Sequence, residues 1–445
     1  MSTFLFASIP IPAHTTNPLP IAARLVERGH RVLWYAGKVF HPQIAAVGAE
    51  PLPYVNAEDF GGQDLTEYWP QFKDLPPIQV IRRAFADLFV GHAPQRVADL
   101  RQIIAGTPVG AMLCDALMFG VGLTSELEGV PWATFGDGPL PFEEPDTPPF
   151  GPGLQPMRGS IGRLRNAVIR ASANRFIFRD AQRVYQTTRA ALGLPPATRP
   201  VLEVMASPYL HLQGCTPGFE YPRKALPEQV HWVGALRPDV PLDWNPPSWW
   251  SEVVGSARPV VLASQGSIRP DVKLLVPTVR ALAEENVLVV VTTGQADPDE
   301  LTRHFGGELP ANVRVTRFVP YDPALSHARA FVTNGGYTGV TLALANGVPL
   351  VQAGTTEEKV EIAARIRYSG VGLALGTTRP TSRAIADGVG RVLTEPGFAA
   401  AAGRPRDEMA EHDAGREGAD LMERLAVTGR PVLHSEGVGS GVAES

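Results

Sequence analysis

Short apolar runs alternate with segments of helical periodicity along the first half of the chain. Residues 3–8 form an apolar run that ends before a proline-rich turn, and the apolar positions of 19–26 recur at helical spacing. Further apolar runs cover 31–35 and 109–115, and the second of these ends in Asp115. A strand, a loop, a helix and a strand in this order predict the opening of a doubly wound parallel sheet.

The second half shows the same class of pattern without repeating the sequence. Helical segments separate apolar runs that predict strands over 260–264, 287–291, 313–318, 330–333 and 349–352. The run at 287–291 is apolar throughout, as expected of a strand that is covered on both faces of a sheet. The chain is about three times the usual domain size, so we expect a second α/β domain here.

Two segments interrupt these patterns. Residues 137–156 are crowded with proline, glycine and acidic residues and predict a long loop. An arginine-rich helical stretch follows, and we interpret it as a solvated helix face in preference to a membrane-surface patch. Its arginines are Arg158, Arg163, Arg165, Arg170, Arg175, Arg179 and Arg183.

Periodicity fails around residues 214–250, where seven prolines occur, and this segment is the best candidate for a connection between domains. The last residues are polar and rich in glycine and serine, which is typical of a disordered tail. The expected division is a first domain over 1–215, a linker over 216–240, a second domain over 241–405, a C-terminal helix over 406–428 that packs back on the first domain, and a disordered tail over 429–445.

The composition limits the classes of function. The chain has 445 residues with a formal net charge of −5, and 44% of them are hydrophobic. No basic excess marks a nucleic-acid partner, and Cys114 and Cys215 are too few for a disulfide framework. No stretch approaches the roughly 18 apolar residues that a membrane span needs. We therefore expect a cytoplasmic protein without a membrane span or a nucleic-acid partner.

One candidate catalytic pair lies at the ends of two predicted strands. His14 follows the first strand, in the segment Pro12 to Pro18, and Asp115 ends the strand at 109–115. Open parallel sheets bind ligands at the carboxyl ends of their strands. A carboxylate beside an imidazole fixes its tautomer and stabilises the imidazolium, so the pair predicts a general base. The alternatives are a solvated histidine and an aspartate that caps the following helix.

A second candidate site is the glycine-rich turn between the predicted strand at 330–333 and the next helix. Its sequence, residues 333–340, is TNGGYTGV. Glycines allow close approach of the backbone, and a helix N-terminus offers free N–H groups to phosphate. The polar residues Glu357, Glu358 and Lys359 follow the next strand and would lie beside the same cradle.

Two other motifs are set aside. Asp297-Pro298-Asp299 resembles a metal–diphosphate signature, but it precedes an acidic helix start, so we interpret it as a helix cap. Gly120-Val121-Gly122 lacks the third glycine of the dinucleotide fingerprint. We expect neither an obligatory metal nor a nicotinamide cofactor.

The segment RFVPYDPALSHARAFVTNGGYTGVTLALANGVPLVQAGTTEEKVEIAARI resembles the nucleotide-sugar signature of glycosyltransferase family 1. The opening PAHTTNPLPIAARLVERGHRV looks like the acceptor side of the same family, in which a histidine is the base and an aspartate holds it. The resemblance spans nearly the whole chain and is closest to actinobacterial enzymes that glycosylate natural products such as macrolide antibiotics. It implies the GT-B fold, with two Rossmann-like doubly wound domains that face a cleft.

The resemblance assigns roles to individual residues. His14 and Asp115 match the base and the residue that holds it. On the donor side, it places Phe318 and Val319 at the nucleotide base, Gly266 and Ser267 near the diphosphate, Gly335, Gly336, Thr338 and Gly339 in the phosphate turn, and Glu358 and Lys359 at the sugar hydroxyls. Its acceptor pocket forms in the first domain, where aromatic residues are available as lining or as core: Trp69, Phe72, Phe85, Phe89, Phe142 and Phe150.

Three positions depart from the family pattern. The family's histidine at the head of the glycine turn is Asn334, which carries no charge. A serine that often follows is Gly339, so Thr338 is the available hydroxyl. Many members that use UDP have a glutamate for the ribose hydroxyls, and this chain has Leu342. An apolar residue there favours a dTDP donor, which lacks the 2′-hydroxyl, over a UDP donor.

The expected activity is that of an inverting, metal-independent hexosyltransferase without a cofactor. It would move a sugar from a dTDP- or UDP-sugar to a hydroxyl of a small lipophilic acceptor, such as a polyketide, a macrolide or a phenolic compound. Two alternatives remain open: a catalytically silent GT-B protein that binds nucleotide and activates a partner, and a GT-B epimerase that acts on the nucleotide sugar itself.

Overall fold

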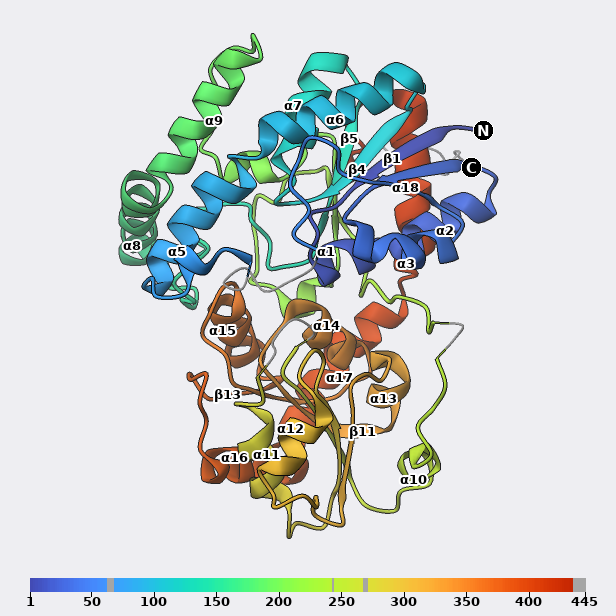
Figure 1. Ribbon diagram of the computed structural model, residues 1–445. Coiled ribbons are helices and arrows are strands. Elements are labelled where there is room, and N and C mark those ends of the chain that lie inside the picture. Colours follow the sequence, from blue (N-terminus) through green and yellow to red (C-terminus); the bar gives the residue numbers. More distant parts are fainter. Residues whose placement is uncertain (62–67, 242–243, 267–270, 435–445) are drawn as a thin grey trace, which may run out of the picture.

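The computed structural model describes residues 1–61, 68–241, 244–266 and 271–434 of the chain. It contains two α/β domains, one above the other in the view of Figure 1. Each is built on its own parallel sheet, as the sequence predicts. None of the helices in these residues is long and apolar enough to cross a membrane.

The first sheet has seven parallel strands in the order β3-β2-β1-β4-β5-β6-β7. The direction of winding reverses between β1 and β4, and this is the point at which open sheets bind ligands. The strands are β1 (Thr3–Ala7), β2 (Arg31–Tyr35), β3 (Glu50–Leu52), β4 (Ala111–Asp115), β5 (Trp132–Gly136), β6 (Leu210–Gln213) and β7 (Val230–Trp232).

Both faces of this sheet are covered by apolar side chains. Successive residues of a strand point to opposite faces, so Leu5 and Ala7 of β1 join one apolar cluster while Phe4 and Phe6 join another. The helices around the sheet are α1 (Pro12–Thr16), α2 (Leu19–Glu27), α3 (His41–Ala46), α5 (Pro77–Arg83), α6 (Ala93–Gly106), α7 (Phe119–Glu128), α8 (Gly159–Ser172) and α9 (Arg179–Ala191). Shorter 3₁₀ and π segments lie at Lys38–Phe40, Pro70–Phe72, Ala84–Phe89, Ala173–Ile177, Glu203–Met205 and Pro217–Phe219.

The second sheet has six parallel strands in the order β10-β9-β8-β11-β12-β13, so its switch point lies between β8 and β11. The strands are β8 (Val260–Ser264), β9 (Leu288–Thr292), β10 (Val313–Thr316), β11 (Ala328–Thr333), β12 (Leu350–Gln352) and β13 (Gly372–Ala374). The helices are α10 (Trp250–Val254), α11 (Leu275–Leu282), α12 (Pro298–Arg303), α13 (Tyr321–His327), α14 (Tyr337–Ala345), α15 (Lys359–Ser369), α16 (Ser382–Thr394) and α17 (Pro396–Ala410).

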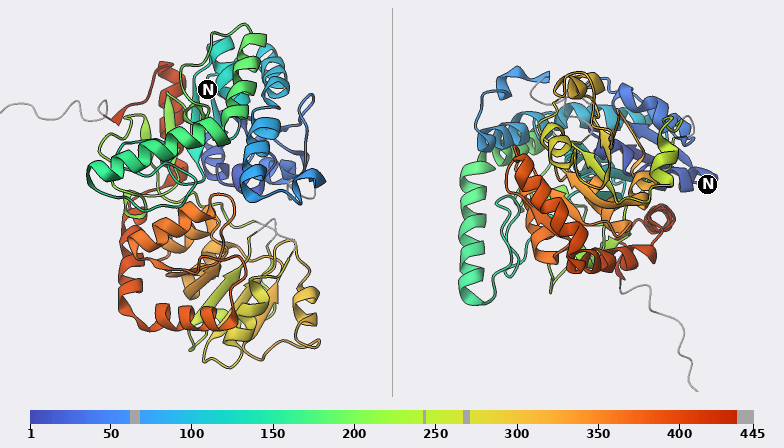
Figure 2. Two further views of the ribbon diagram at one scale, coloured as in Figure 1. Left: turned by 90° about the vertical axis from the view of Figure 1, so that its left-hand side faces the viewer. Right: turned by 90° about the horizontal axis from the view of Figure 1, so that it is seen from below.

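The chain returns to the first domain at its end (Figures 1 and 2). Helix α18 (Ala414–Thr428) packs beside α2, and its Met422 and Leu425 lie in the same apolar cluster as Phe4 and Phe6. The approach of the two helices requires a glycine, because a Cβ on Gly418 would lie 2.7 Å from the Ile21 side chain. The segment expected as one helix over 406–428 is the end of α17 followed by α18.

Two expected boundaries differ in the structure. The segment 216–240 is not a linker throughout, because it contains β7, the last strand of the first sheet. Prolines around this short strand hide its pattern in the sequence. The start of the expected disordered tail is ordered: Val432 is buried, and its N–H donates to the Tyr209 carbonyl at 2.8 Å. Residues 435–445 lie outside the described residues.

Candidate active site

Helix α1 carries His14 at the switch point of the first sheet. Pro12 occupies the first turn of α1, where a missing N–H group is tolerated, and the Thr15 hydroxyl donates to the Ile9 carbonyl at 3.3 Å. The sequence predicts His14 in a loop, whereas the structure places it in this one-turn helix. Its side chain is 17% exposed, so one edge of the ring reaches the surface.

Two carboxylates flank the same nitrogen of His14. Its Nδ1 lies 3.2 Å from Asp115 Oδ1 and 2.8 Å from Asp137 Oδ2. Asp115 ends β4 and is held by two backbone donors, since Ile9 N donates to Oδ2 and Leu117 N to Oδ1, both at 2.9 Å. Asp115 holds the turn before α7 but does not cap this helix, whose N-cap residue is Met118 and which has no side-chain cap. Among the described residues, His14 Nε2 has no hydrogen-bond partner.

Asp137 is a site residue that the sequence analysis missed. It follows β5, the strand beside β4, so its carboxylate and that of Asp115 lie at the same edge of the sheet. The run Trp132–Gly136 is apolar and ends in an aspartate, which is the same signal that identified Asp115. The signal was hidden because Asp137 also begins a segment rich in proline and acidic residues.

The charges around His14 favour its protonated form. Burial lowers the pKa of His14, but the negative charges of Asp137 and Asp115 outweigh this effect and raise the pKa well above 6.5. The ring is therefore more readily protonated than an ordinary histidine, and only its neutral form, with Nε2 unprotonated, can act as a base. A proton taken up at Nε2 would be stabilised by both carboxylates acting at Nδ1.

The glycine-rich turn lies at the switch point of the second sheet. Gly335 has φ 92°, and Gly266 at the end of β8 also has φ 92°. The Asn334 amide bridges the two segments, since its Nδ2 donates to the Gln265 carbonyl and its Oδ1 accepts from Gly336 N. A Cβ on Gly266 would lie 2.8 Å from Asn334 Nδ2, so the close approach of these segments requires glycine.

The N–H groups of this turn are not all free for a ligand. Gly335 N donates to Thr333 Oγ1 at 3.1 Å, and Gly336 N donates to Asn334 Oδ1 at 3.2 Å. Helix α14 starts directly afterwards, and its N-cap residue Gly336 gives it no side-chain cap. The first turn of α14 therefore offers the N–H groups that a phosphate would accept from.

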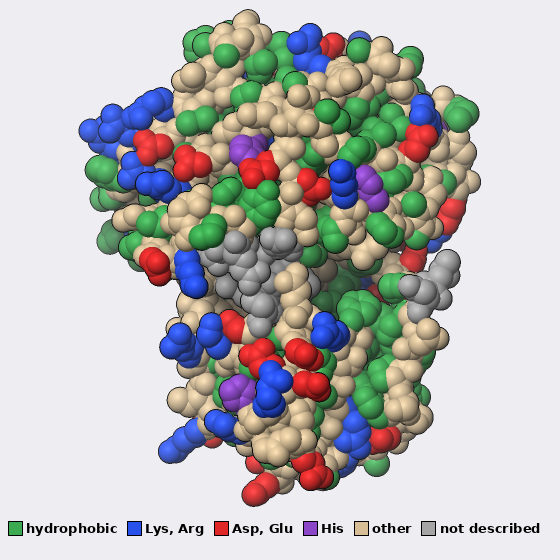
Figure 3. All heavy atoms as spheres, in the orientation of Figure 1, with side chains coloured by type: hydrophobic (Ala, Val, Ile, Leu, Met, Phe, Trp, Pro, Cys, Tyr) green, Lys and Arg blue, Asp and Glu red, His purple; other side chains and the backbone are tan. Residues whose placement is uncertain are grey.

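Thr338 points to the other domain. Its hydroxyl and the side chain of Asn17 exchange two hydrogen bonds, in which Asn17 Nδ2 donates to Oγ1 and Oγ1 donates to Asn17 Oδ1, both at 3.1 Å. Asn17 is the C-cap residue of α1. The two switch points are therefore joined directly, and the surface is hollowed between the domains (Figure 3).

The other donor-side positions lie in different surroundings. Val319 and Leu342 are each 3% exposed and belong to one apolar cluster, whereas Phe318 is 56% exposed. Gly339 is buried against Tyr321 and Phe331. Ser267 lies outside the described residues.

Glu358 and Lys359 begin helix α15, which follows β12. Glu358 is its N-cap residue, and Lys359 Nζ forms ion pairs with Glu357 and Glu358. Glu357 has φ 56°, a left-handed conformation that is rare for a residue with a side chain. Asp297 has the role predicted for it, because its side chain accepts from Asp299 N at 3.2 Å and caps α12.

The aromatic residues of the first domain do not form one set. Trp69 and Phe72 belong to a group with ring centroids 6.2 Å apart, and Phe85 and Phe89 pack together at 5.5 Å. Phe142 packs edge-on against His211, and Phe150 is 37% exposed in the loop that follows. Trp69, Phe85 and Phe89 share one apolar cluster, to which Phe142 and Phe150 do not belong.

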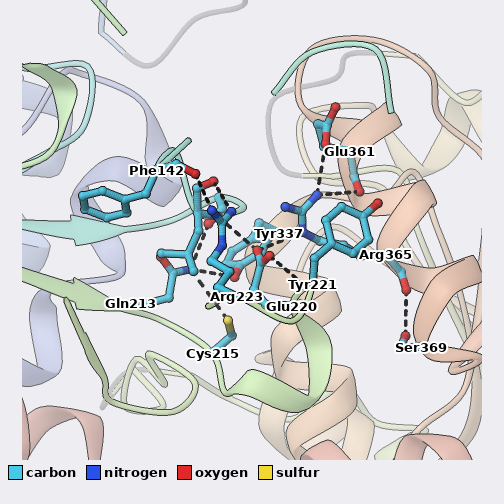
Figure 4. A network of polar contacts seen from close by, with 12 residues as sticks. Phe142, Gln213, Cys215, Glu220, Tyr221, Arg223, Tyr337, Glu361, Arg365 and Ser369 are labelled. Carbon is cyan, nitrogen blue, oxygen red and sulfur yellow. Dashed lines mark hydrogen bonds and ion pairs between the residues drawn. The ribbon is translucent and has the colours of Figure 1, made fainter. Parts of the chain in front are cut away.

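A buried charge cluster fixes this loop to the second domain (Figure 4). Arg365 of α15 donates through Nε to Glu220 Oε1 at 2.8 Å and through Nη1 to Glu361 Oε2 at 3.0 Å. These three side chains are at most 3% exposed. Glu361 Oε1 also accepts from the N–H groups of Gly151 at 2.8 Å and Gly153 at 2.7 Å. Helix α15 is thus tied to the loop that begins at Asp137.

A neutral polar chain also crosses the junction. Burial lowers the pKa of His211 to about 4, so its ring is neutral. Its Nδ1 contacts the Thr134 hydroxyl at 2.8 Å, and its Nε2 contacts Gln213 Oε1 at 3.1 Å. Gln213 Nε2 donates to the Tyr337 hydroxyl at 2.8 Å. Because Gln213 Oε1 can only accept, the His211 proton is on Nε2, and the chain positions the first residue of α14.

Comparison with known proteins identifies the family. The model described as the erythromycin biosynthesis protein CIII-like, C-terminal domain, matches residues 274–425. The 4'-demethylrebeccamycin synthase of Lentzea aerocolonigenes is 42% identical over 423 residues, which cover 95% of this chain and 99% of that protein. UDP-glycosyltransferase 2 of Phaeomoniella chlamydospora is 30% identical, with 95% of each chain covered.

The chain belongs to glycosyltransferase family 1. It is a glycosyltransferase of the natural-product type, and the names of relatives that cover nearly the whole chain favour the transferase over the silent activator and the epimerase. Solved structures confirm the GT-B fold: the calicheamicin glycosyltransferase CalG4 has a TM-score of 0.72 at 20% identity, and covers 96% of this chain and 99% of its own. The glycosyltransferase of kitacinnamycin has a TM-score of 0.71 at 21% identity, with 95% and 98% covered.

Proposed function

We propose that this glycosyltransferase moves a sugar from a nucleoside diphosphate to a hydroxyl group of a small lipophilic acceptor, with inversion at the anomeric carbon. The observation that carries the proposal is the placement of His14, whose Nδ1 faces two carboxylates while α1 is joined to the donor-side turn through Asn17 and Thr338. A base on one domain and an anion-binding turn on the other are the two groups that this reaction needs.

His14 Nε2 takes the proton of the acceptor hydroxyl. The acceptor oxygen then forms a bond to the anomeric carbon while the bond from that carbon to the diphosphate oxygen breaks. A single displacement of this kind inverts the configuration. Asp115 and Asp137 hold the tautomer with the proton on Nδ1 and stabilise the imidazolium that forms.

The leaving diphosphate is stabilised by the first turn of α14, which follows the turn at Gly335 and Gly336. Free N–H groups and the positive end of the helix dipole act where negative charge develops. Because these N–H donors can stabilise the diphosphate without a cation, we propose that the reaction has no obligatory metal. Glu358 and Lys359, at the start of α15, are proposed to contact the sugar hydroxyls.

A thymidine-type donor is the proposed preference. The family resemblance aligns Leu342 with a glutamate that serves the ribose hydroxyls, and leucine has no acceptor for a 2′-hydroxyl. Two structural neighbours, VinC and the spinosyn rhamnosyltransferase SpnG, are described in complex with thymidine diphosphate. Several sequence relatives are named UDP-glycosyltransferases, so UDP-sugars are the donors to compare.

The acceptor is proposed to be lipophilic. Apolar and aromatic side chains of the first domain, among them Trp69 and Phe85, are partly exposed near its surface. Relatives named for zeaxanthin and for demethylrebeccamycin point to the same class of acceptor. We place the reaction in the cytoplasm, since Cys114 and Cys215 are both free and buried.

The test is product formation by the full-length enzyme with a panel of polyketide, macrolide and phenolic acceptors, each offered dTDP- and UDP-sugars. Mass spectrometry detects the glycoside, and NMR of the product reads the anomeric configuration. We expect inversion, unchanged turnover in EDTA, and nucleoside diphosphate release only with acceptor present. A product with retained configuration would exclude the single-displacement mechanism. Loss of activity in EDTA with recovery in Mg²⁺ or Mn²⁺ would show that the reaction needs a metal.

A further inference from the structure

An arginine-rich segment lies at the edge of the first domain, away from the site. Helix α8 and the π segment Ala173–Ile177 form this edge, and α8 runs along the margin of the molecule in Figure 2. Residues 157–179 contain six arginines and no acidic residue, in a chain whose formal net charge is −5. The segment is therefore strongly positive in an otherwise acidic protein.

The amphipathic pattern of α8 is inverted. Its two buried residues are Gly162 and Asn166, and the Asn166 side chain donates to the Pro145 carbonyl at 2.9 Å. Its outward face carries Ile161, Leu164 and Val168, which are 75%, 65% and 56% exposed. Spacings of three and four residues place these side chains on one face of the helix. A surface helix of a globular protein normally turns its apolar face to the core.

The apolar residues gather with arginines. Met157 and Phe176 extend the same edge, so the segment holds five of the fifteen large hydrophobic residues that are exposed in the described part of the chain. Figure 3 shows this mixture of hydrophobic and basic side chains at the left edge of the molecule. The face is thus not formed by solvated arginines alone, as the sequence analysis expected, because apolar side chains share it.

These arginines differ in whether they form ion pairs within the described part of the chain. Arg163 and Arg170 form ion pairs with Asp146 and Glu143. Exposed Arg158, Arg175 and Arg179 form no ion pair with any residue that the structure describes. An apolar stripe between unpaired arginines is complementary to a surface with an apolar interior and anionic groups above it.

We propose that the outward face of α8 docks the enzyme on an anionic lipid surface. The stripe Ile161–Leu164–Val168 would enter the boundary between headgroups and acyl chains, and the arginines would extend their guanidinium groups to the phosphates. The helix would lie in the plane of the surface without crossing it. This interaction is independent of the donor and acceptor proposed above.

Two other occupants fit the face less well. A symmetric contact with a second copy would bring two arginine-rich faces together, and like charges across an interface are unfavourable. A protein partner normally buries about 800 Å² on each side, whereas a stripe of single side chains along one helix edge is narrow. A lipid surface needs no complementary shape.

The test is flotation of the full-length protein with phosphatidylcholine vesicles and with vesicles that also contain phosphatidylglycerol. We expect flotation with the anionic vesicles only, weakened by added salt. The double variant Ile161→Ser/Leu164→Ser should lower the bound fraction about tenfold through the loss of buried apolar area, and Arg158→Gln/Arg175→Gln should lower it through the loss of charge. All four side chains are exposed, so the fold should be retained.

The matched control is Val427→Ser/Arg383→Gln, which changes exposed residues of α18 and α16 far along the chain. It should float like the wild type, and glycosyl transfer to a water-soluble acceptor should be unchanged in all three variants. The proposal fails if the wild type does not float with anionic vesicles, or if the α8 variants float equally well. It also fails if sedimentation shows a dimer without vesicles that Ile161→Ser/Leu164→Ser dissociates, because the face would then join two copies.

Discussion

Asn17 and Thr338 join the two domains through a reciprocal pair of hydrogen bonds, each 3.1 Å long. Asn17 ends the short helix that carries His14, and Thr338 lies in the first turn of α14, directly after the glycine-rich turn. A displacement of one domain therefore changes the position of the base relative to the phosphate cradle. The Thr338 hydroxyl, which the sequence assigns to phosphate, is already occupied.

We predict that Asn17→Ala and Thr338→Val lower turnover to a similar extent, about tenfold if the two hydrogen bonds contribute on the order of 1 kcal/mol or more together. The double variant should be no worse than either single variant, because both remove the same contact. The affinity for nucleoside diphosphate, measured by calorimetry, should be unchanged in both. Weaker nucleotide binding in Thr338→Val alone would instead assign the hydroxyl to phosphate.

Replacing His14 by alanine should lower turnover by roughly 10²–10⁴, the usual contribution of a positioned general base. Nucleotide affinity should change little, because the donor lies chiefly on the other domain. The comparison uses saturating acceptor and donor, with His41→Ala as a control on a half-buried histidine of the same domain. Turnover like that of the wild type would exclude His14 from the chemical step.

The pH dependence of kcat/KM should show whether the charge of Asp137 acts on His14. His14 must be neutral to accept a proton, and its pKa is raised above 6.5, so the acidic limb of kcat/KM should lie above pH 6.5. Asp137→Asn keeps the shape of the side chain but removes its charge, so the limb should move to lower pH. Because the folded pKa is raised, this ion pair stabilises the fold below pH 6.5 and is lost as pH rises through the folded pKa.

The control for this experiment is Asp297→Asn, which removes a carboxylate from the cap of α12 in the other domain. Its pH profile should match that of the wild type. If the limb of Asp137→Asn stays in place, Asp115 alone governs the proton on His14. The denaturation midpoint of Asp137→Asn should also vary less with pH above 6.5 than that of the wild type.

Local signals predicted most of the sheet architecture. The runs that became β1, β4, β9 and β11 are apolar because each strand is covered on both faces, and the polar residue after a run marks the edge where ligands bind. This logic found His14, Asp115 and the glycine-rich turn. It missed β3, β5, β6, β7 and β13; at β7, prolines mask a three-residue strand.

Contacts between distant segments could not be predicted in this way. The pairing of Asn17 with Thr338 spans 321 positions, and nothing local to either residue identifies its partner. The ion pair of Arg365 with Glu220 has the same character, since 145 positions separate the two residues. The outward apolar face of α8 was missed because periodicity defines a face but not the direction in which it points.

Arg365 should be the most sensitive residue at the domain junction. Arg365→Met would leave Glu220 and Glu361 buried without their counter-charge, a change that costs about 3–5 kcal/mol in comparable buried pairs. Glu361→Gln should cost less, because an amide oxygen still accepts from the N–H groups of Gly151 and Gly153. Urea denaturation monitored by fluorescence gives the midpoints.

The matched control is Arg391→Met, which breaks an ion pair with Glu395 in which both side chains are about half exposed. Exposed pairs contribute little, so its midpoint should stay close to that of the wild type. Equal loss of stability in Arg365→Met and Arg391→Met would show that the buried cluster contributes no more than a surface pair.

The last prediction concerns the ribose of the donor. Leu342 is 3% exposed and packs in the apolar cluster that contains Val319. A 2′-hydroxyl buried against it without an acceptor should cost on the order of 1–3 kcal/mol, about 5- to 150-fold in affinity. UDP and 2′-deoxy-UDP differ only in this hydroxyl, so the deoxy compound should bind more tightly by that factor. Comparing dTDP with 2′-deoxy-UDP then isolates the effect of the methyl group of the base.

The variant Leu342→Ala, assayed below its unfolding temperature, tests the cause of this preference. The smaller side chain leaves space for a water that can bind the 2′-hydroxyl, so the difference in affinity between UDP and 2′-deoxy-UDP should become smaller. Equal dissociation constants for these two nucleotides on the wild type would show that the ribose hydroxyl is satisfied elsewhere, and the thymidine preference would lose its basis.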